Sequence, residues 1–159
     1  RDGAPLEEVV GRLLRERGET LSVAESCTGG YVGQRITSIA GSSDYFVGGF
    51  LTYTEASKRE LLGVDEQLLR EHGAVSEQVA EAMARGARER TGTTWGLSVT
   101  GVAGPGGGTE ANPVGTVIVG LAGPARARAH RLRFLGDRER IRLWASQAAL
   151  DTLRRGLLA

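Results

Sequence analysis

Glycine divides this sequence into short apolar segments. It accounts for 24 of the 159 residues, about twice its usual share of ~7%. The glycines follow no repeat, which excludes a collagen-like chain and a flexible linker. They gather in loops between apolar stretches, as expected where the backbone must approach a ligand. A chain of this length can bury one core, so we expect one globular domain.

The spacing of apolar and helix-capping residues predicts the order α-β-α-β-α-α-α-β-β-β-α. Helices are expected at 5–17, at 31–39, after Thr54, after Asp65, from Ser76 to Arg90 and after Asp137, and strands at 20–25, 45–53, 94–100, 114–122 and 125–134. This order predicts the α/β class, with a mixed β-sheet and helices on both faces in three layers. The faces expected to point inward carry Val79, Met83 and Ala87, and Ile141, Trp144, Ala145, Ala148 and Leu153.

Composition and charge exclude several classes of function. No apolar run approaches the roughly 20 residues of a membrane span, and a net charge of +1 gives no reason to expect a broad nucleic-acid surface. The single cysteine, Cys27, excludes an intrachain disulfide, and His72 and His130 lack zinc-type spacing. We expect no metal and no cofactor. The first residue is not methionine, so the chain is expected to be a fragment or a domain of a longer protein. The single cysteine and the arginine-rich helices suit a cytoplasmic setting.

Ser26 follows a predicted strand and precedes a predicted helix. This position presents a hydroxyl at the edge of a sheet, where the first N–H groups of the helix can stabilise an oxyanion or bind phosphate. The alternative is an ordinary N-cap serine. The pattern G-x-S-x-G is absent, so the nucleophile elbow of α/β-hydrolases is not expected.

Lys58 is the only lysine beside 19 arginines. Burial can neutralise a lysine but not an arginine, so Lys58 is a candidate base for a serine nucleophile. The alternative is a residual surface lysine. Tyr53 lies five residues earlier at the expected strand end and is either a proton donor that orients the amine or a half-buried strand residue. Cys27 is a second candidate nucleophile, although a small buried residue is the interpretation we favour.

The segment 101–113 is a glycine- and proline-rich loop that is long for a small domain. It lacks the P-loop pattern, and no strand is followed by G-x-G-x-x-G, so nucleotide sites of those kinds are not expected. Its N–H groups could still hold a polar ligand. Among Arg138, Arg140 and Arg142, one could pair with a phosphate, whereas the basic strip Arg126, Arg128, Arg131 and Arg133 is expected to be solvated.

Several motifs together resemble the CinA C-terminal family. They are AESCTGG at 24–30, GSSDYFVGGFLTYTEASK at 41–58, LLGV at 61–64, HGAVSE at 72–77, TGVAGPGGGTEANPVGTV at 100–117 and FLGDRERIR at 134–142. They cover nearly the whole chain in order. The resemblance implies an amidohydrolase that converts nicotinamide mononucleotide to nicotinate mononucleotide and ammonia.

The resemblance also assigns roles to residues. Ser26 corresponds to the nucleophile, Lys58 to its base and Tyr53 to the tyrosine beside them. The residues expected to bind substrate are Thr28, Gly29, Gly30, Thr100, Gly101, Ala103, Gly104 and either Arg142 or Arg138, with Arg142 favoured. We expect a small nucleotide as the partner, no membrane or nucleic acid, and a homodimer or a higher homo-oligomer. The alternatives are a nucleotide- or protein-binding module with weak activity, and an amidase for a non-nucleotide substrate.

Overall fold

Five strands form one mixed sheet in the computed structural model, which describes residues 3–159. The strands are β1 (Leu21–Glu25), β2 (Phe46–Leu51), β3 (Trp95–Gly101), β4 (Thr116–Ala122) and β5 (Ala127–Arg133). Their order across the sheet is β2-β1-β3-β4-β5. Strand β1 runs parallel to both β2 and β3, whereas β3–β4 and β4–β5 are antiparallel. The three parallel strands therefore end at a common edge.

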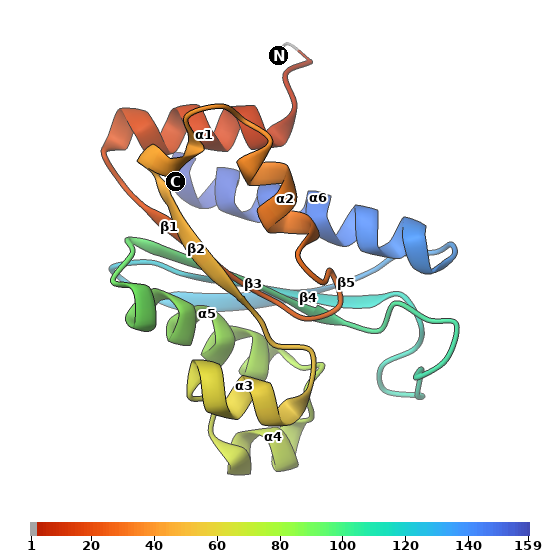
Figure 1. Ribbon diagram of the computed structural model, residues 1–159. Helices are drawn as coiled ribbons and strands as arrows, with labels where there is room; N and C mark the ends of the chain where they lie inside the picture. Colours follow the sequence, from red (N-terminus) through yellow and green to blue (C-terminus); the bar gives the residue numbers. More distant parts are fainter. Residues whose placement is uncertain (1–2) are drawn as a thin grey trace.

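Helices cover both faces of this sheet. They are α1 (Leu6–Arg17), α2 (Tyr31–Thr37), α3 (Glu55–Leu62), α4 (Glu66–His72), α5 (Glu77–Thr91) and α6 (Arg138–Leu158), with a 3₁₀ turn at Ser42–Asp44. Figure 1 shows α1, α2 and α6 above the sheet and α3, α4 and α5 below it. The predicted three-layer α/β/α architecture is confirmed.

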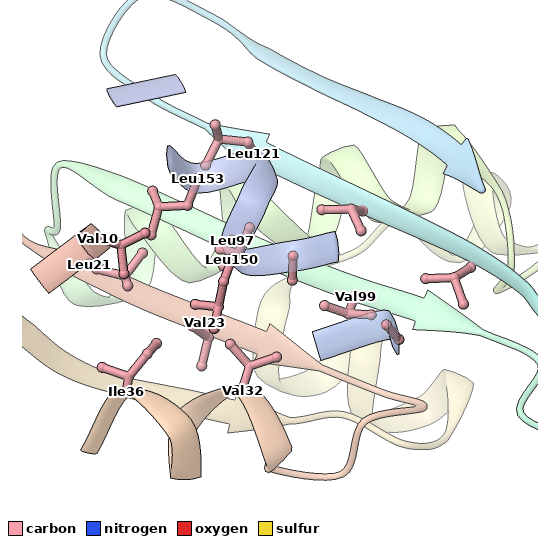
Figure 2. Packing of buried hydrophobic residues seen from close by; sticks show 14 of the residues in the cluster. Val10, Leu21, Val23, Val32, Ile36, Leu97, Val99, Leu121, Leu150 and Leu153 are labelled. Carbon is pink, nitrogen blue, oxygen red and sulfur yellow. The ribbon is translucent and has the colours of Figure 1, made fainter. Parts of the chain in front are cut away.

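Two apolar clusters join the layers. The larger one packs α1, α2 and α6 against the sheet, and Figure 2 shows Val10, Leu21, Val23 and Leu150 within it. The smaller one lies on the opposite face and contains Ala24 of β1 together with the side chains of the predicted inward face of α5, Val79, Met83 and Ala87. That face is confirmed. Strand β1 is buried along its whole length because helices cover both of its faces.

One residue of the predicted core is misplaced, and strands β2, β4 and β5 are each shorter than expected by at least two residues. Trp144 is 45% exposed, although Ile141, Ala145 and Leu153 of the same helix are buried as predicted. It lies on the flank of the buried stripe beside Leu143, which is also exposed. Strand β2 ends at Leu51, so the predicted strand 45–53 overran its end by two residues.

Within residues 3–159, no helix is both long enough and apolar enough to cross a lipid bilayer.

Helix α5 lies so close to β3 that the contact requires glycine. A Cβ atom added to Gly96 would lie 2.2 Å from the carbonyl oxygen of Ala84. This oxygen belongs to the backbone of α5, so the helix itself would have to move.

We predict that Gly96→Ala lowers the free energy of unfolding by about 1–3 kcal/mol, as overpacking of a core does. Chemical denaturation measures the change. Gly106→Ala is the matched control because a Cβ atom there would meet nothing within 4 Å. Equal stabilities of the two variants would contradict the close approach of α5 and β3.

Candidate active site

Three chain segments meet at the edge where the parallel strands end. Ser26 follows β1 directly, and its N–H donates to the carbonyl of Val99 in β3 at 2.9 Å. Thr52 follows β2, and its N–H donates to the carbonyl of Glu25 at 2.9 Å. The loop after Gly101 leaves β3 at the same edge. In α/β sheets, ligands bind at the carboxyl ends of parallel strands, so this edge is the candidate site.

Ser26 and Lys58 are in direct contact at this edge. The Nζ atom of Lys58 lies 2.9 Å from Ser26 Oγ and also donates to the carbonyl oxygen of Thr52 at 2.7 Å. The side chains are almost enclosed, since Lys58 is 1% and Ser26 7% exposed. The sequence-based pairing of a serine with the single lysine is thus matched by the geometry.

Local capping places Lys58 where it can reach Ser26. The N–H of Ser57 donates to Thr54 Oγ1 and the N–H of Thr54 donates to Ser57 Oγ, each at 3.1 Å. This reciprocal capping box fixes the start of α3. Lys58 therefore projects from the first turn of a helix that is separated from β2 by only three residues.

Burial changes the acidity of Lys58. Desolvation lowers its pKa from 10.5 to about 8. Its position in the first turn of α3, where the helix dipole disfavours a cation, acts in the same direction. Both contacting oxygens are uncharged, so neither holds the proton as a carboxylate would. At pH 7 a group with this pKa is unprotonated roughly one time in ten.

Cys27 is buried, as predicted, and its thiol has low reactivity at neutral pH. Burial raises the pKa of its thiol to about 12, so the nucleophilic thiolate is scarce at neutral pH. The side chain packs close to Gly101, where an added Cβ would lie 3.3 Å from the sulfur. Ser26 is the better candidate nucleophile.

Tyr53 lies beyond β2 and is 61% exposed, so the alternative of a half-buried strand residue is wrong. Its hydroxyl accepts a hydrogen bond from Arg138 Nη2 at 2.9 Å. Within residues 3–159, the amine of Lys58 donates to Ser26 and to Thr52 and forms no hydrogen bond with Tyr53. The structure thus brings Tyr53 to the rim of the site but not onto the amine.

Glu25 is a site residue that our sequence reasoning missed. Its carboxylate is 1% exposed and accepts from Thr28 Oγ1 at 2.6 Å and from three backbone N–H groups. These donors are Gly30 at 3.2 Å, Val32 at 3.0 Å and Gly33 at 2.8 Å. A carboxylate at the end of an apolar strand, directly before the candidate nucleophile, was the signal available in the sequence.

The contacts of Glu25 revise the expected role of the start of α2. We expected its first N–H groups to serve an oxyanion or a phosphate, but Glu25 already occupies those of Gly30, Val32 and Gly33. The hydroxyl of Thr28 is likewise engaged, and the residue is fully buried. The amides of Cys27 and Thr28 remain as candidate donors beside Ser26.

The loop after β3 is anchored to its surroundings. The hydroxyl of Thr100 donates to the carbonyl of Ala74 at 2.9 Å, and Asn112 Nδ2 donates to the carbonyl of Val75 at 3.0 Å. A Cβ atom on Gly101 would lie 2.5 Å from the carbonyl oxygen of Thr116, so this position requires glycine. Ala103 and Gly104 are buried against the site.

The two candidate arginines of α6 hold different segments. Arg138 Nη1 donates to the carbonyl of Gly104 at 2.7 Å, so it joins the loop after β3 to Tyr53. Arg142 donates through Nε to the carbonyl of Cys27 at 3.1 Å and through Nη2 to that of Thr28 at 2.9 Å. Arg140 is exposed, and so is the basic strip, made of Arg126, Arg128, Arg131 and Arg133.

We predict that Glu25→Gln lowers the free energy of unfolding by about 1–3 kcal/mol, because its amide leaves one of the buried N–H groups without an acceptor. Urea denaturation measures this change. The control is Glu60→Gln, whose side chain is 68% exposed and which should shift stability by less than about 0.5 kcal/mol. If both variants match the unchanged chain, the carboxylate does not hold this loop.

Comparison with curated proteins shows close relatives along almost the whole chain. A CinA-like protein of Acaryochloris marina is 54% identical over 160 residues, which cover 99% of this chain and 38% of that protein. Another, from a Cyanothece species, is 57% identical over 159 residues, with the same coverages. The chain therefore spans 38% of the length of these relatives.

Solved structures and a family model agree with this relationship. A competence-damaged protein (CinA) superfamily protein from Klebsiella pneumoniae superposes with a TM-score of 0.93 at 33% identity, covering 96% of each chain. A competence/damage-inducible protein from Agrobacterium tumefaciens gives a TM-score of 0.91 at 38% identity, covering 100% of this chain and 99% of that one. The model of the CinA C-terminal domain matches residues 3–157. The chain therefore belongs to the CinA C-terminal domain family.

Proposed function

We propose that this chain is an amidohydrolase that converts nicotinamide mononucleotide to nicotinate mononucleotide and ammonia. The observation that carries the proposal is the 2.9 Å contact between Ser26 Oγ and a buried Lys58 whose pKa is lowered to about 8. A serine paired with a neutral amine is a known solution for acyl transfer. The choice of this nucleotide rests on the family resemblance.

The first half of the reaction forms an ester on Ser26. The neutral amine of Lys58 accepts the Ser26 proton while Oγ attacks the carboxamide carbon of the substrate. The positive charge of the pyridinium ring already makes that carbon electrophilic. The tetrahedral intermediate then collapses, the C–N bond breaks, and the ammonium of Lys58 returns its proton to the departing ammonia.

The second half releases the acid. Water attacks the ester carbonyl, and Lys58 accepts a proton from that water. The bond to Ser26 Oγ breaks, and Lys58 returns the proton to the serine. The carbonyl of Thr52 accepts from Lys58 Nζ at 2.7 Å and keeps the amine beside the hydroxyl. One lysine thus acts as base and acid in both halves.

The phosphate of the substrate needs a cationic or N–H-rich partner. Glu25 already accepts from the first N–H groups of α2, which argues against that helix start. Arg138 lies at the rim, bound to the carbonyl of Gly104 and to Tyr53. We assign the phosphate to Arg138 and the loop after β3 that carries Gly104, because a guanidinium binds phosphate strongly.

The activity itself is the first test. We expect the purified chain to release ammonia from nicotinamide mononucleotide, and Lys58→Arg to lose activity by a factor of about 10² or more, because arginine cannot act as a base. An ammonia assay measures both, and thermal melting shows whether each variant is folded. Cys27→Ala is the control and should keep substantial activity.

Three results would contradict this assignment. Near-normal turnover by Lys58→Arg would show that Lys58 is not the base. If Cys27→Ala loses activity and Ser26→Ala keeps it, the nucleophile is the thiol of Cys27. No ammonia from the unchanged chain favours a binding module, and equal kcat/KM for the nucleotide and its dephosphorylated riboside favours an amidase for a non-nucleotide substrate.

The pH dependence is a separate prediction. Lys58 must be unprotonated to accept the serine proton, and burial lowers its pKa to about 8. We therefore expect kcat/KM to rise from pH 6, with a half-maximal value near pH 8, and to level off above it. Initial rates at low substrate concentration give the profile. A rise centred near the ordinary lysine value of 10.5 would show that Lys58 is not the buried base.

A further inference from the structure

Arg142 binds the backbone of the nucleophile loop, residues 26–30. Its Nε donates to the carbonyl of Cys27 at 3.1 Å, and its Nη2 donates to the carbonyl of Thr28 at 2.9 Å. These carbonyls belong to the two residues that follow Ser26, and they lie 115 and 114 positions away from Arg142 in the sequence. Two N–H groups of one guanidinium therefore fix two consecutive peptide groups.

The orientation of these peptides decides where their N–H groups point. The Cys27–Thr28 peptide is trans, so its N–H points opposite to its C=O. A carbonyl held by Arg142 thus directs the N–H of Thr28 away from α6. In the preceding peptide, the carbonyl of Ser26 accepts from the N–H of Gly29 at 3.1 Å, which fixes the N–H of Cys27 in the same way.

These two N–H groups are buried without a conventional acceptor. Within residues 3–159, neither the N–H of Cys27 nor that of Thr28 donates to a backbone carbonyl. Cys27 is 5% exposed and Thr28 is 0% exposed. Buried N–H groups without a partner are rare in proteins, and each one calls for an explanation. Adjacent to a serine nucleophile, the explanation with a chemical function is an oxyanion site.

We propose that Arg142 is a positioning residue: by holding the carbonyls of Cys27 and Thr28 it fixes the loop after Ser26, so that the Cys27 amide faces the oxyanion formed at Ser26. This inference rests on the serine–lysine hydrolysis proposed above. It differs from the role of a phosphate ligand, because Arg142 holds the backbone beside the nucleophile, whereas Arg138 holds the rim of the site. Arg142 Nη2 packs closely over Gly29, where an added Cβ atom would lie 3.2 Å from it.

Glu25 complements Arg142 by binding groups of the opposite kind. The carboxylate accepts from amides at the start of α2, whereas the guanidinium donates to carbonyls of the nucleophile loop. Hydrogen bonds with one ionised partner are roughly twice as strong as neutral ones. Glu25 thus binds N–H groups and Arg142 binds carbonyl groups of this segment. Together they keep Ser26 and the neighbouring amides in one geometry.

The test separates positioning from phosphate binding. We would measure kcat and KM of Arg142→Gln and Arg142→Lys with nicotinamide mononucleotide and with its dephosphorylated riboside. We expect Arg142→Gln to lower kcat by a factor on the order of 10² on both substrates, as loss of an oxyanion donor does. KM for the nucleotide should change by less than about threefold, because uniform binding is untouched. Arg142→Lys keeps one donor group and should retain more activity.

Arg155→Gln is the matched control. It removes another guanidinium of α6, whose side chain is 74% exposed and pairs with Asp151, and it should leave both constants unchanged. If Arg142→Gln melts below the assay temperature, Arg142→Lys supplies the comparison. A rise in KM for the nucleotide alone, with normal riboside hydrolysis, would overturn the proposal and make Arg142 the phosphate ligand. Unchanged kcat on both substrates would also overturn it.

A second measurement keeps this inference distinct from the choice of substrate. A fluorophosphonate forms a bond between Ser26 Oγ and phosphorus, releases fluoride and places its oxygen where the oxyanion would form. Mass spectrometry measures the rate at which Ser26 is labelled. We expect this rate to be lower in Arg142→Gln than in the unchanged chain and in Arg155→Gln. Labelling without nucleotide hydrolysis would reject the substrate and leave the positioning role standing. An unchanged chain that neither hydrolyses nor reacts would remove both proposals.

Discussion

The Nζ atom of Lys58 lies between Ser26 Oγ and the carbonyl of Thr52, almost out of contact with water. A buried ammonium without a charged partner is costly, because it has lost its hydration. This cost lowers the pKa of Lys58 and favours the neutral amine. Uncharged partners are essential to this result, because a carboxylate in either position would favour the protonated form. The same enclosure lowers the pKa of the Lys58 amine and raises the pKa of the Cys27 thiol, so burial favours the neutral form of both groups.

The sheet brings the chemistry together because three parallel strands end at one edge. Strand β1 delivers Ser26, the turn after β2 delivers Thr52 and the start of α3, and β3 delivers the loop that carries Gly104. Helix α6 closes the arrangement from the far end of the sequence through Arg138 and Arg142. The position of these polar groups depends on both apolar clusters, since one seats α6 and the other seats the layer below the sheet.

Much of the fold follows from short-range sequence signals. Thr54, Asp65, Ser76 and Asp137 each cap the helix predicted after them, because a side-chain oxygen there accepts from an N–H two or three residues ahead. The errors arise where a long-range contact decides. Trp144 has helical spacing suited to a core, but the sheet below α6 covers only a narrow stripe. Tyr53 was expected at a strand end, but it lies past the last ladder pair and binds Arg138.

The sequence by itself determined the order of elements, most helix starts and the family, and it singled out Ser26 and Lys58 as a candidate pair. The element order and the helix starts depend on residue type and on neighbours within about one helical turn, so they can be read locally. Only the tertiary structure decided the acidity of Lys58, the occupation of the α2 amides by Glu25, and the difference between Arg138 and Arg142. Each of these depends on which groups are removed from water together and on contacts between segments far apart in the chain, such as Cys27 and Arg142. Desolvation and competition for hydrogen bonds depend on which groups lie close together in space. The pattern of residues along the chain therefore does not predict them.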